Sequence, residues 1–269
     1  MRGRSDNVSE NLRVVVMTQS DRFFIPHNIR VASEVCELCE IVQVDCKSSL
    51  ENKLGDYLSW FGFFQCAKMG VRTVLRAAKG IFDRLTGFRI CGGECSVSHV
   101  ARALGVPYRV ITDSNAPDFV EQMRKLSPDL IISYSAPQVI KPELLRIPKH
   151  GIINVHGSLL PDYRGCLPSF WYLYNEEKVG GATVHYMSEK IDDGGIIKQG
   201  SVDISECRSM FSLIGKTKKL GGILMADAIK DIADGRDVTV PNDTSKGRYF
   251  TWPTKDQAKE FRKKGYRFS

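Results

Sequence analysis

The chain has 269 residues, a formal net charge of +7 at pH 7, and hydrophobic and charged fractions of 42% and 26%. These values are typical of a globular protein with a substantial buried core. No segment approaches about 18 uninterrupted apolar residues, which argues against a transmembrane helix. The polar start of the chain, MRGRSDNVSENLR, lacks the apolar segment of a secretory signal, so we expect a cytoplasmic protein. The positive charge suits an anionic partner, such as a phosphorylated substrate, RNA or a membrane surface.

The chain contains eight cysteines, and in a cytoplasmic protein we expect them to be reduced thiols. The pairs Cys36/Cys39 and Cys91/Cys95 together raise the alternative of a four-cysteine zinc site. The first pair, however, lies in the apolar stretch VASEVCELCEIV, where cysteine is a common buried filler. We therefore expect no bound metal, with these four cysteines as the alternative zinc ligands.

The first elements of the chain predict a β-α-β unit. The continuously apolar, β-branched stretch LRVVVMT predicts a buried strand over residues 12–18. A helix near 29–38 and a second strand over 40–46 follow, an order that favours a parallel sheet with right-handed crossovers. The loop TQSDRFFIPHN after the first strand has no GxGxxG pattern, so a dinucleotide-binding enzyme is disfavoured.

Residues 48–89 form an insert of unusual composition. Aromatic residues crowd its first part: Trp60, Phe61, Phe63 and Phe64. Basic residues then alternate with apolar ones, as is typical of one or two basic amphipathic helices. The basic residues are Arg72, Arg76, Lys79 and Arg84. We favour a helical lid or a dimer contact, because most such faces are packed, and we therefore expect a homodimer. Membrane-surface contact through residues 58–85 is the alternative.

Strands and helices alternate regularly after the insert. Strands are predicted over 107–112, 129–135, 151–158, 180–189 and 196–204. Helices are predicted over 97–106, 116–127, 167–176 and 209–235, the last with a kink at Gly221-Gly222. The pattern predicts an α/β catalytic domain over 12–205, containing the helical insert, and a C-terminal helix and tail over 206–269.

The apolar strand at 151–158 ends in polar residues within the sequence NVHGSLLP. Asn154 and His156 are two residues apart, so their side chains point to the same face of the strand. Ligands of open α/β sheets bind at the carboxyl ends of the strands. There a histidine can act as a general acid or base, and an asparagine amide can donate to an oxyanion. A turn-forming asparagine and a histidine bonded to backbone would produce the same pattern, so this motif alone does not decide.

Two further segments place polar residues in loops. DYRGCLP puts Arg164 in a tight loop before a helix, where it can hold an anion or brace the loop. MSEKIDDGG puts Asp192 and Asp193 before two glycines, between two strands. A carboxylate held near His156 would stabilise an imidazolium or accept a proton. An ordinary Asp-Gly hairpin turn is the alternative.

In order and spacing, NVHGSLLPDYRG and GGATVHYMSEKIDDGGIIKQG closely resemble the folate-dependent formyltransferase family. That family includes glycinamide ribonucleotide transformylase, methionyl-tRNA formyltransferase and the sugar N-formyltransferases. The resemblance runs over about residues 12–205 and is sharpest over 129–200. It implies a Rossmann-like, mostly parallel formyltransferase fold with a helical insert and a short C-terminal extension.

The resemblance places Asn154, His156 and Asp192 on the family's catalytic positions. Asp192 is preferred to Asp193 because it follows the apolar Ile191, as in the family's Ile-Asp or Leu-Asp pair. The implied reaction is direct transfer of a formyl group from 10-formyltetrahydrofolate to a primary amine. The asparagine and the protonated histidine would stabilise the oxyanion, and the aspartate would hold the histidine's charge and assist proton removal. The resemblance implies neither a metal nor a covalent intermediate.

Other residues fall on supporting positions of the same family. Ser158, Arg164 and His185 are expected to support the substrate or the catalytic residues. The stretch APQVIKP resembles the segment that lines the pterin pocket, and the loop 189–194 should close over its other side. The residues expected to contact the folate are therefore Gln138, Val139, Ile140, Asp192 and Asp193.

The acceptor is the least determined part of the sequence-based hypothesis. Only about 35 residues follow the long helix, fewer than the β-barrel of methionyl-tRNA formyltransferase needs. The glycine-rich phosphate loop of glycinamide ribonucleotide transformylase is not matched, and the ending GRYFTWPTKDQAKEFRKKGYRF resembles that of sugar-type enzymes. We therefore expect an amino sugar attached to a nucleotide. The alternatives are methionyl-tRNA, glycinamide ribonucleotide, a lipid-linked amino sugar, hydrolysis of formyltetrahydrofolate, and a catalytically idle scaffold.

Overall fold

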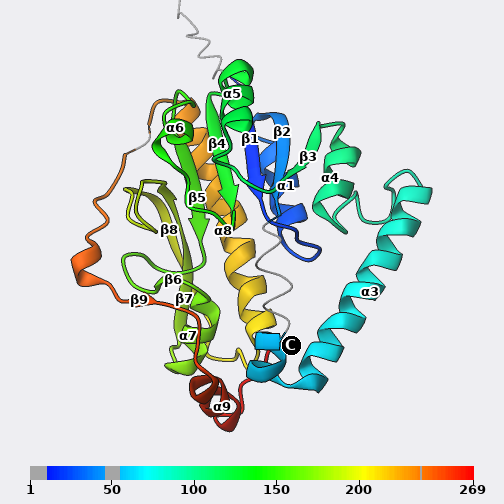
Figure 1. Ribbon diagram of the computed structural model, residues 1–269, viewed down its shortest axis with the longest axis vertical. Helices are drawn as coiled ribbons and strands as arrows, with labels where there is room; N and C mark the ends of the chain where they lie inside the picture. Colours follow the sequence, from blue (N-terminus) through cyan, green and yellow to red (C-terminus); the bar gives the residue numbers. More distant parts are fainter. Residues whose placement is uncertain (1–10, 46–54, 237) are drawn as a thin grey trace, which may run out of the picture.

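The computed structural model describes residues 11–45, 55–236 and 238–269. A seven-stranded sheet with the order β3-β2-β1-β4-β5-β7-β8 forms the centre of the molecule (Figure 1). Its strands are β1 (Arg13–Thr18), β2 (Glu37–Val44), β3 (Tyr108–Ile111), β4 (Leu130–Tyr134), β5 (Ile152–His156), β7 (Val179–Tyr186) and β8 (Ile196–Asp203). The first five run parallel, and β7 and β8 are antiparallel to their neighbours. The predicted mostly parallel α/β fold is confirmed.

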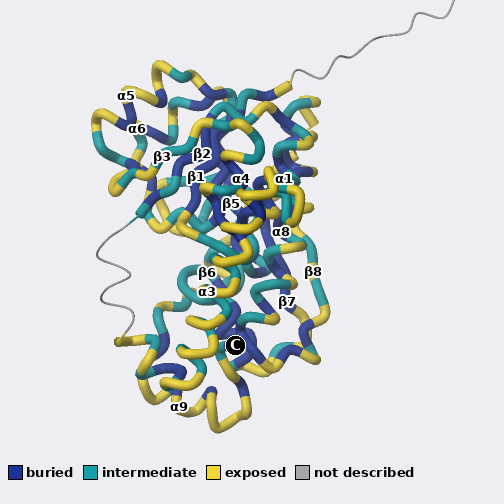
Figure 2. The backbone as a smooth tube through the Cα atoms, turned by 90° about the vertical axis from the view of Figure 1, so that its right-hand side faces the viewer, coloured by how far each residue is buried: buried dark blue, intermediate teal, exposed yellow. Residues whose placement is uncertain are grey.

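Helices cover both faces of this sheet. They are α1 (Ile25–Ser33), α4 (Val97–Leu104), α5 (Pro117–Leu126), α6 (Pro142–Leu145) and α8 (Met210–Ala233). Alternate residues of β1 show the two layers: Val14 and Val16 pack with α1, α4 and α8, whereas Val15 and Met17 pack with α5 and α6. Buried backbone follows the strands and α8 (Figure 2). Strands buried on both faces explain the continuous apolar runs in the sequence.

The helix predicted near 29–38 is wrong in its bounds, because α1 ends at Ser33 and β2 already begins at Glu37. The helix starts early because the Asp21 carboxylate accepts hydrogen bonds from three successive backbone N–H groups, at 2.7 to 3.0 Å. Pro26 then occupies the first turn, where its missing N–H costs nothing. The apolar residues after α1 are compatible with a helix or with a buried strand. They form the strand β2 because they pair with β1.

The long helix α8 continues through Gly221 and Gly222. A Cβ atom at Gly221 would lie 2.6 Å from Val155 of β5, and one at Gly222 would lie 2.4 Å from the Asn28 amide of α1. The two glycines therefore allow α8 to approach the sheet and α1 closely. This packing brings the N-terminal half of α8 beside the carboxyl end of β5.

Within the described part of the insert, residues 55–61 are helical and α3 spans Phe63–Leu85. Gly62 separates the two helices with a φ of 78°, a conformation that favours glycine. The predicted helical character is confirmed there, and the prediction for residues 48–54 lies outside the described residues. Figure 1 shows α3 running along one side of the molecule, away from the sheet. No helix within the described ranges is long and apolar enough to cross a membrane.

A second core, of mainly aromatic residues, is separate from the two layers that cover the sheet. It joins residues 57–61 to α7 (Pro168–Tyr174), α9 (Lys255–Lys263) and the C-terminal tail. The short strands β6 (Arg164–Gly165) and β9 (Tyr249–Phe250) pair beside it. Trp171 donates from Nε1 to the Thr251 carbonyl at 3.0 Å, and its ring stacks on Phe250. The C-terminal tail therefore packs against α7 and the first part of the insert.

Candidate active site

Four of the predicted residues converge where β5 ends. Asn154 and His156 lie on β5, and His185 lies on the adjacent antiparallel strand β7. The register of the two strands places Asn154 directly opposite His185. Asp192 comes from the loop between β7 and β8 and reaches both histidines. Residues separated by up to 38 positions in the chain therefore meet because two strands pair in one register.

Both ring nitrogens of His156 face hydrogen-bond acceptors. Nε2 lies 2.9 Å from the carbonyl oxygen of Tyr163, so this nitrogen must donate. Nδ1 lies 3.6 Å from a carboxylate oxygen of Asp192. The ring therefore lies between a carbonyl oxygen and a carboxylate. Asp192 is placed to pair with His156 when both ring nitrogens carry hydrogen.

His185 has the opposite environment, although it touches the same carboxylate. Its Nδ1 lies 2.8 Å from the Tyr186 carbonyl and must donate, while its Nε2 lies 3.2 Å from Nδ2 of Asn154 and must accept. Burial lowers the pKa of His185 to about 4, with Asp192 raising it and His156 lowering it further. His185 is therefore neutral, and its accepting nitrogen fixes which way the Asn154 amide points.

Asp192 is held by backbone contacts as well as by the histidines. One of its carboxylate oxygens accepts a hydrogen bond from the Gly165 N–H at 2.9 Å. Its φ of 51° lies in the left-handed region, and Asn242 donates to its carbonyl oxygen at 2.9 Å. Two residues later, a Cβ atom on Gly194 would lie only 1.9 Å from the Tyr186 carbonyl oxygen, so a larger residue would clash there. This glycine allows the loop to fold tightly against β7, which aims Asp192 at His156.

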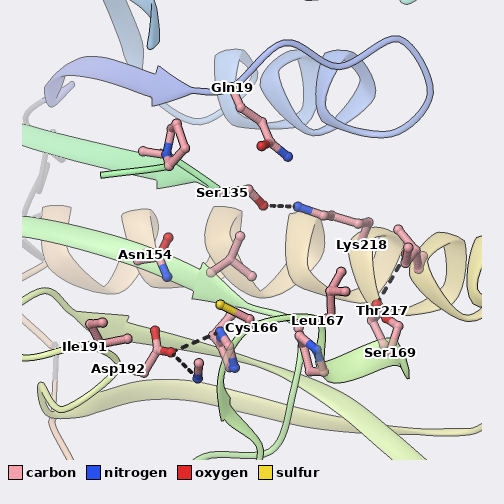
Figure 3. A pocket seen from close by; sticks show the side chains of 18 of the residues that line it. Gln19, Ser135, Asn154, Cys166, Leu167, Ser169, Ile191, Asp192, Thr217 and Lys218 are labelled. Carbon is pink, nitrogen blue, oxygen red and sulfur yellow. Dashed lines mark hydrogen bonds and ion pairs between the residues drawn. The ribbon is translucent and has the colours of Figure 1, made fainter. Parts of the chain in front are cut away.

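A cavity of about 690 Å³ opens in front of these residues. Its volume is within the range of pockets that hold small-molecule substrates. Figure 3 shows Asn154 and Asp192 on one side and Gln19, Ser135 and Lys218 on the other. Aromatic and apolar side chains complete the far wall: Phe23, Phe24, Tyr57, Met69, Phe211, Trp252 and Phe268. The cavity therefore offers a polar end, which holds the candidate catalytic residues, and a largely apolar wall.

Residues 136–140 of the segment APQVIKP, for which the resemblance implies a pterin pocket, line this cavity together with Ser135. The Gln138 side chain points to a neighbouring loop, where it accepts from Ser114 and donates to the Thr112 carbonyl. Asn115 donates to the Val139 carbonyl at 2.9 Å. These contacts tie the segment to the loop at 112–115, and the Gln138 side chain acts as a brace.

The other predicted residues take bracing positions. Ser158 is buried and donates to the carbonyl oxygens of Asp162 and Tyr163, which shapes the loop that His156 contacts. Arg164 points toward the tail, where it donates to the Thr244 carbonyl at 3.4 Å and lies over the Tyr249 ring. Neither Arg164 nor Asp193 is among the residues that line the cavity. Of the two roles suggested for Arg164, holding an anion or bracing the loop, its contacts with the tail fit bracing.

Sequence reasoning missed Lys218, which lies on α8 and lines the cavity. Its ammonium group contacts the Ser135 hydroxyl (Figure 3). Burial lowers the pKa of Lys218, and the charge of Asp21 partly opposes this shift. A partly buried lysine in a substrate-sized cavity is a candidate for holding an anionic group. In the sequence it is one of several lysines on an amphipathic helix, and only the packing of α8 distinguishes it.

The four cysteines of the alternative zinc site do not gather within the described residues. Cys91 and Cys95 lie together, with Asp83 as their third potential ligand, and all three ligand atoms are within 4.8 Å of one another. The Asp83 carboxylate already accepts hydrogen bonds from the backbone N–H groups of residues 90, 91 and 93. Burial raises the pKa of Asp83, but these donors outweigh it and lower the pKa below its usual value. This cluster closes the loop after α3.

The chain is similar to known proteins in sequence and in fold. The model of the formyl transferase family matches residues 99–229, the span that carries Asn154, His156, His185 and Asp192. Glycinamide ribonucleotide transformylase 1 from Symbiobacterium toebii is similar in structure, with a TM-score of 0.58 and 16% identity over 87% of this chain and 96% of that one.

Two sugar-modifying enzymes are similar to a comparable degree. A sugar N-formyltransferase from Shewanella sp FDAARGOS_354 has a TM-score of 0.54 and 17% identity, covering 89% of this chain and 76% of that one. WlaRD, a sugar 3N-formyl transferase solved in the presence of dTDP and 5-N-formyl-THF, has a TM-score of 0.58 and 14% identity, covering 90% and 70%. These identities show a shared fold, and the family match covers the segment that carries the site. Residues 99–229 are thus similar to the formyl transferase family in sequence, and the whole chain shares the fold of these enzymes.

Proposed function

We propose that the protein transfers a formyl group from 10-formyltetrahydrofolate to the primary amine of an anionic acceptor, most suitably an amino sugar attached to a nucleotide. The observation that carries the proposal is the convergence of Asn154, His156 and Asp192 at one end of a substrate-sized cavity. Polar groups of this kind serve acyl transfer, because they stabilise negative charge on oxygen and move protons.

The geometry suggests how these residues share the work. As the amine nitrogen bonds to the formyl carbon, negative charge grows on the formyl oxygen. Asn154 can offer an amide hydrogen to this oxygen, since its Nδ2 group carries two hydrogens and His185 takes one. His156, as an imidazolium, supplies positive charge beside it. When the bond between the formyl carbon and the folate nitrogen breaks, that nitrogen gains the proton that the amine loses.

Asp192 is suited to this proton transfer. Its carboxylate faces the cavity, 3.6 Å from Nδ1 of His156, and can accept the amine proton directly or through water. The neutral His185 is a positioning residue, because it touches Asn154 and Asp192 from behind. The segment 135–140 would hold the pterin end of the donor so that its formyl group faces Asn154.

An anionic acceptor is supported by Lys218. This partly buried ammonium group lies across the cavity from Asp192, where the acceptor would extend away from the reacting amine (Figure 3). A phosphate beside Lys218 would offset the cost of burying its charge. The sugar N-formyltransferases of similar fold support an amino-sugar acceptor. Glycinamide ribonucleotide, also an amine with a phosphate, is the second candidate, because a transformylase of that substrate is equally similar in fold.

The proposal is tested by incubating the protein with 10-formyltetrahydrofolate and separate acceptors, namely several amino-sugar nucleotides and glycinamide ribonucleotide. Tetrahydrofolate release and the mass of the acceptor are followed together. A formyl mass gain on an amino-sugar nucleotide, lost in His156→Ala, is the expected result. A gain on glycinamide ribonucleotide alone would reassign the acceptor. Tetrahydrofolate release without any formylated acceptor would contradict transfer and indicate a hydrolase.

A further inference from the structure

The outward side of α3 is an exposed apolar surface. Eight large apolar side chains on this helix are each at least 59% exposed. They are Phe63, Phe64, Val71, Val74, Leu75, Ile81, Phe82 and Leu85, and we call them the α3 outer face. From Val71 onward they recur at positions 71, 74 and 75 and again at 81, 82 and 85, which places them on one side of a helix about 34 Å long. A continuous surface of this kind marks an interaction site.

Both ends of α3 are anchored, so the direction of this face is set by the fold. At the N-terminal end, Trp60 stacks on Trp252 at 5.7 Å between ring centroids, and Phe61 stacks on Phe268 at 4.6 Å. At the C-terminal end, Asp83 binds the backbone of the loop that leads to α4. The helix therefore cannot rotate its apolar side inward without breaking either buried cluster.

The middle of the helix is tied down through its opposite side. Arg76 donates to the carbonyl oxygens of Arg22 and Glu94, at 2.9 and 2.8 Å. The guanidinium of Arg72 lies 4.7 Å from the centre of the Phe211 ring. These two arginines face the body of the protein, which leaves the apolar residues facing away from it.

Charge decides which partner suits the α3 outer face. The sequence of α3 contains five basic residues and a single acidic one, Asp83, whose buried carboxylate is held by backbone N–H groups. Lys79, Arg84 and the nearby Arg89 are exposed at the edges of the apolar face. Two copies of α3 packed together would bring these cations close without any carboxylate from either helix. An anionic partner would instead pair with them.

We propose that the α3 outer face docks on an anionic lipid bilayer, with the helix lying in the plane of the surface. Its phenylalanine, leucine, isoleucine and valine side chains enter the boundary between headgroups and acyl chains, and its exposed cations contact lipid phosphates. The arrangement is that of an interfacial helix: a strongly apolar side, basic flanks, and aromatic residues at the apolar side.

Docking would bring the membrane close to the active site. Tyr57 and Met69 belong to the same insert as the α3 outer face, and both line the catalytic cavity. The two sides of the insert therefore have separate tasks, since one forms a cavity wall and the other forms the docking surface.

The test is flotation of the whole protein with vesicles of phosphatidylcholine alone or mixed with phosphatidylglycerol. The protein is expected to float with the anionic vesicles, and binding should weaken as salt rises because charges at the surface are screened. Val74→Glu and Phe82→Glu should each reduce binding about tenfold or more, since each places a carboxylate in the apolar face. Ile223→Glu, which changes a half-exposed apolar residue on another helix, is the matched control and should bind normally.

Circular dichroism confirms that each variant is folded, and sedimentation velocity reports the assembly state of the same samples. Failure to float with anionic vesicles would overturn the proposal, as would flotation that Val74→Glu and Phe82→Glu leave unchanged. A dimer that dissociates in Val74→Glu and does not bind vesicles would show that a second copy covers α3 instead. Flotation is read without any formyl acceptor, so its outcome is independent of the proposed reaction.

Discussion

The carboxyl end of β5 and the outer side of α3 differ in how their side chains are held. At β5, His156 and His185 are buried, and each of their ring nitrogens faces a polar group. On α3 the large apolar side chains are exposed, and only the ends and the inner side of the helix are anchored. Buried polar groups must be paired, so the catalytic geometry is tied to the sheet register. An exposed face has no such requirement, so it can acquire a separate role.

The largest effect is expected from breaking the paired groups at β5. His156→Ala removes the cation beside the formyl oxygen, and Asp192→Asn removes the carboxylate that accepts the amine proton. Each should lower kcat about 100- to 10,000-fold. Steady-state kinetics with a saturating acceptor measures this, with circular dichroism to verify folding. Activity within a factor of three of the unsubstituted protein would show that these residues are not catalytic.

A matched pair of phenylalanines tests the difference between anchored and exposed parts of the insert. Phe61 is 3% exposed in the aromatic core, whereas Phe64 is 85% exposed on α3. Phe61→Ala should lower the free energy of unfolding by about 3–5 kcal/mol, because it leaves a cavity. Phe64→Ala should change it by less than about 0.5 kcal/mol. Urea unfolding measures both, and similar values for the two variants would contradict the described anchoring.

A substitution of Lys218 tests whether this lysine contributes to binding of an anionic acceptor in the cavity. Lys218→Met should raise the KM for an anionic acceptor about tenfold and affect kcat less, because it removes a contact remote from the reacting carbon. The same variant should not lose stability, since it removes a charge that burial disfavours. Kinetics and thermal unfolding on one sample provide both readings. A large fall in kcat with an unchanged KM would instead place Lys218 at the chemical step.

The smallest effect concerns the pH dependence of stability. Burial lowers the pKa of His185 to about 4 in the folded protein, whereas its ordinary value is 6.5. Between these values the unfolded chain binds the proton more readily, so this histidine's contribution to stability falls as pH decreases from 6.5 toward 4. His185→Gln should flatten the unfolding free energy over this window. Urea titrations at several pH values would measure it, and an unchanged slope would argue that His185 is not buried as a neutral ring.

Secondary structure was most predictable where the sequence pattern was strong. The strand predicted at 129–135 is β4, and the helix predicted at 116–127 is α5, because long apolar or amphipathic runs suit only one environment. The helix near 29–38 was misplaced because VASEVCELCEIV suits both a helix and a buried strand. Pairing with β1 decided between them, and such pairing is a contact between distant residues.

The sequence alone determined the order of elements, the mostly parallel sheet and the motif residues Asn154, His156 and Asp192, since period, turn chemistry and motif order are local properties. Tertiary structure alone decided that His185 lies opposite Asn154, that Lys218 enters the cavity, and that Arg164 turns to the tail. It also decided which side of α3 faces outward. Each of these depends on strand register, helix packing or aromatic anchors, which join residues far apart in the chain and leave no local pattern.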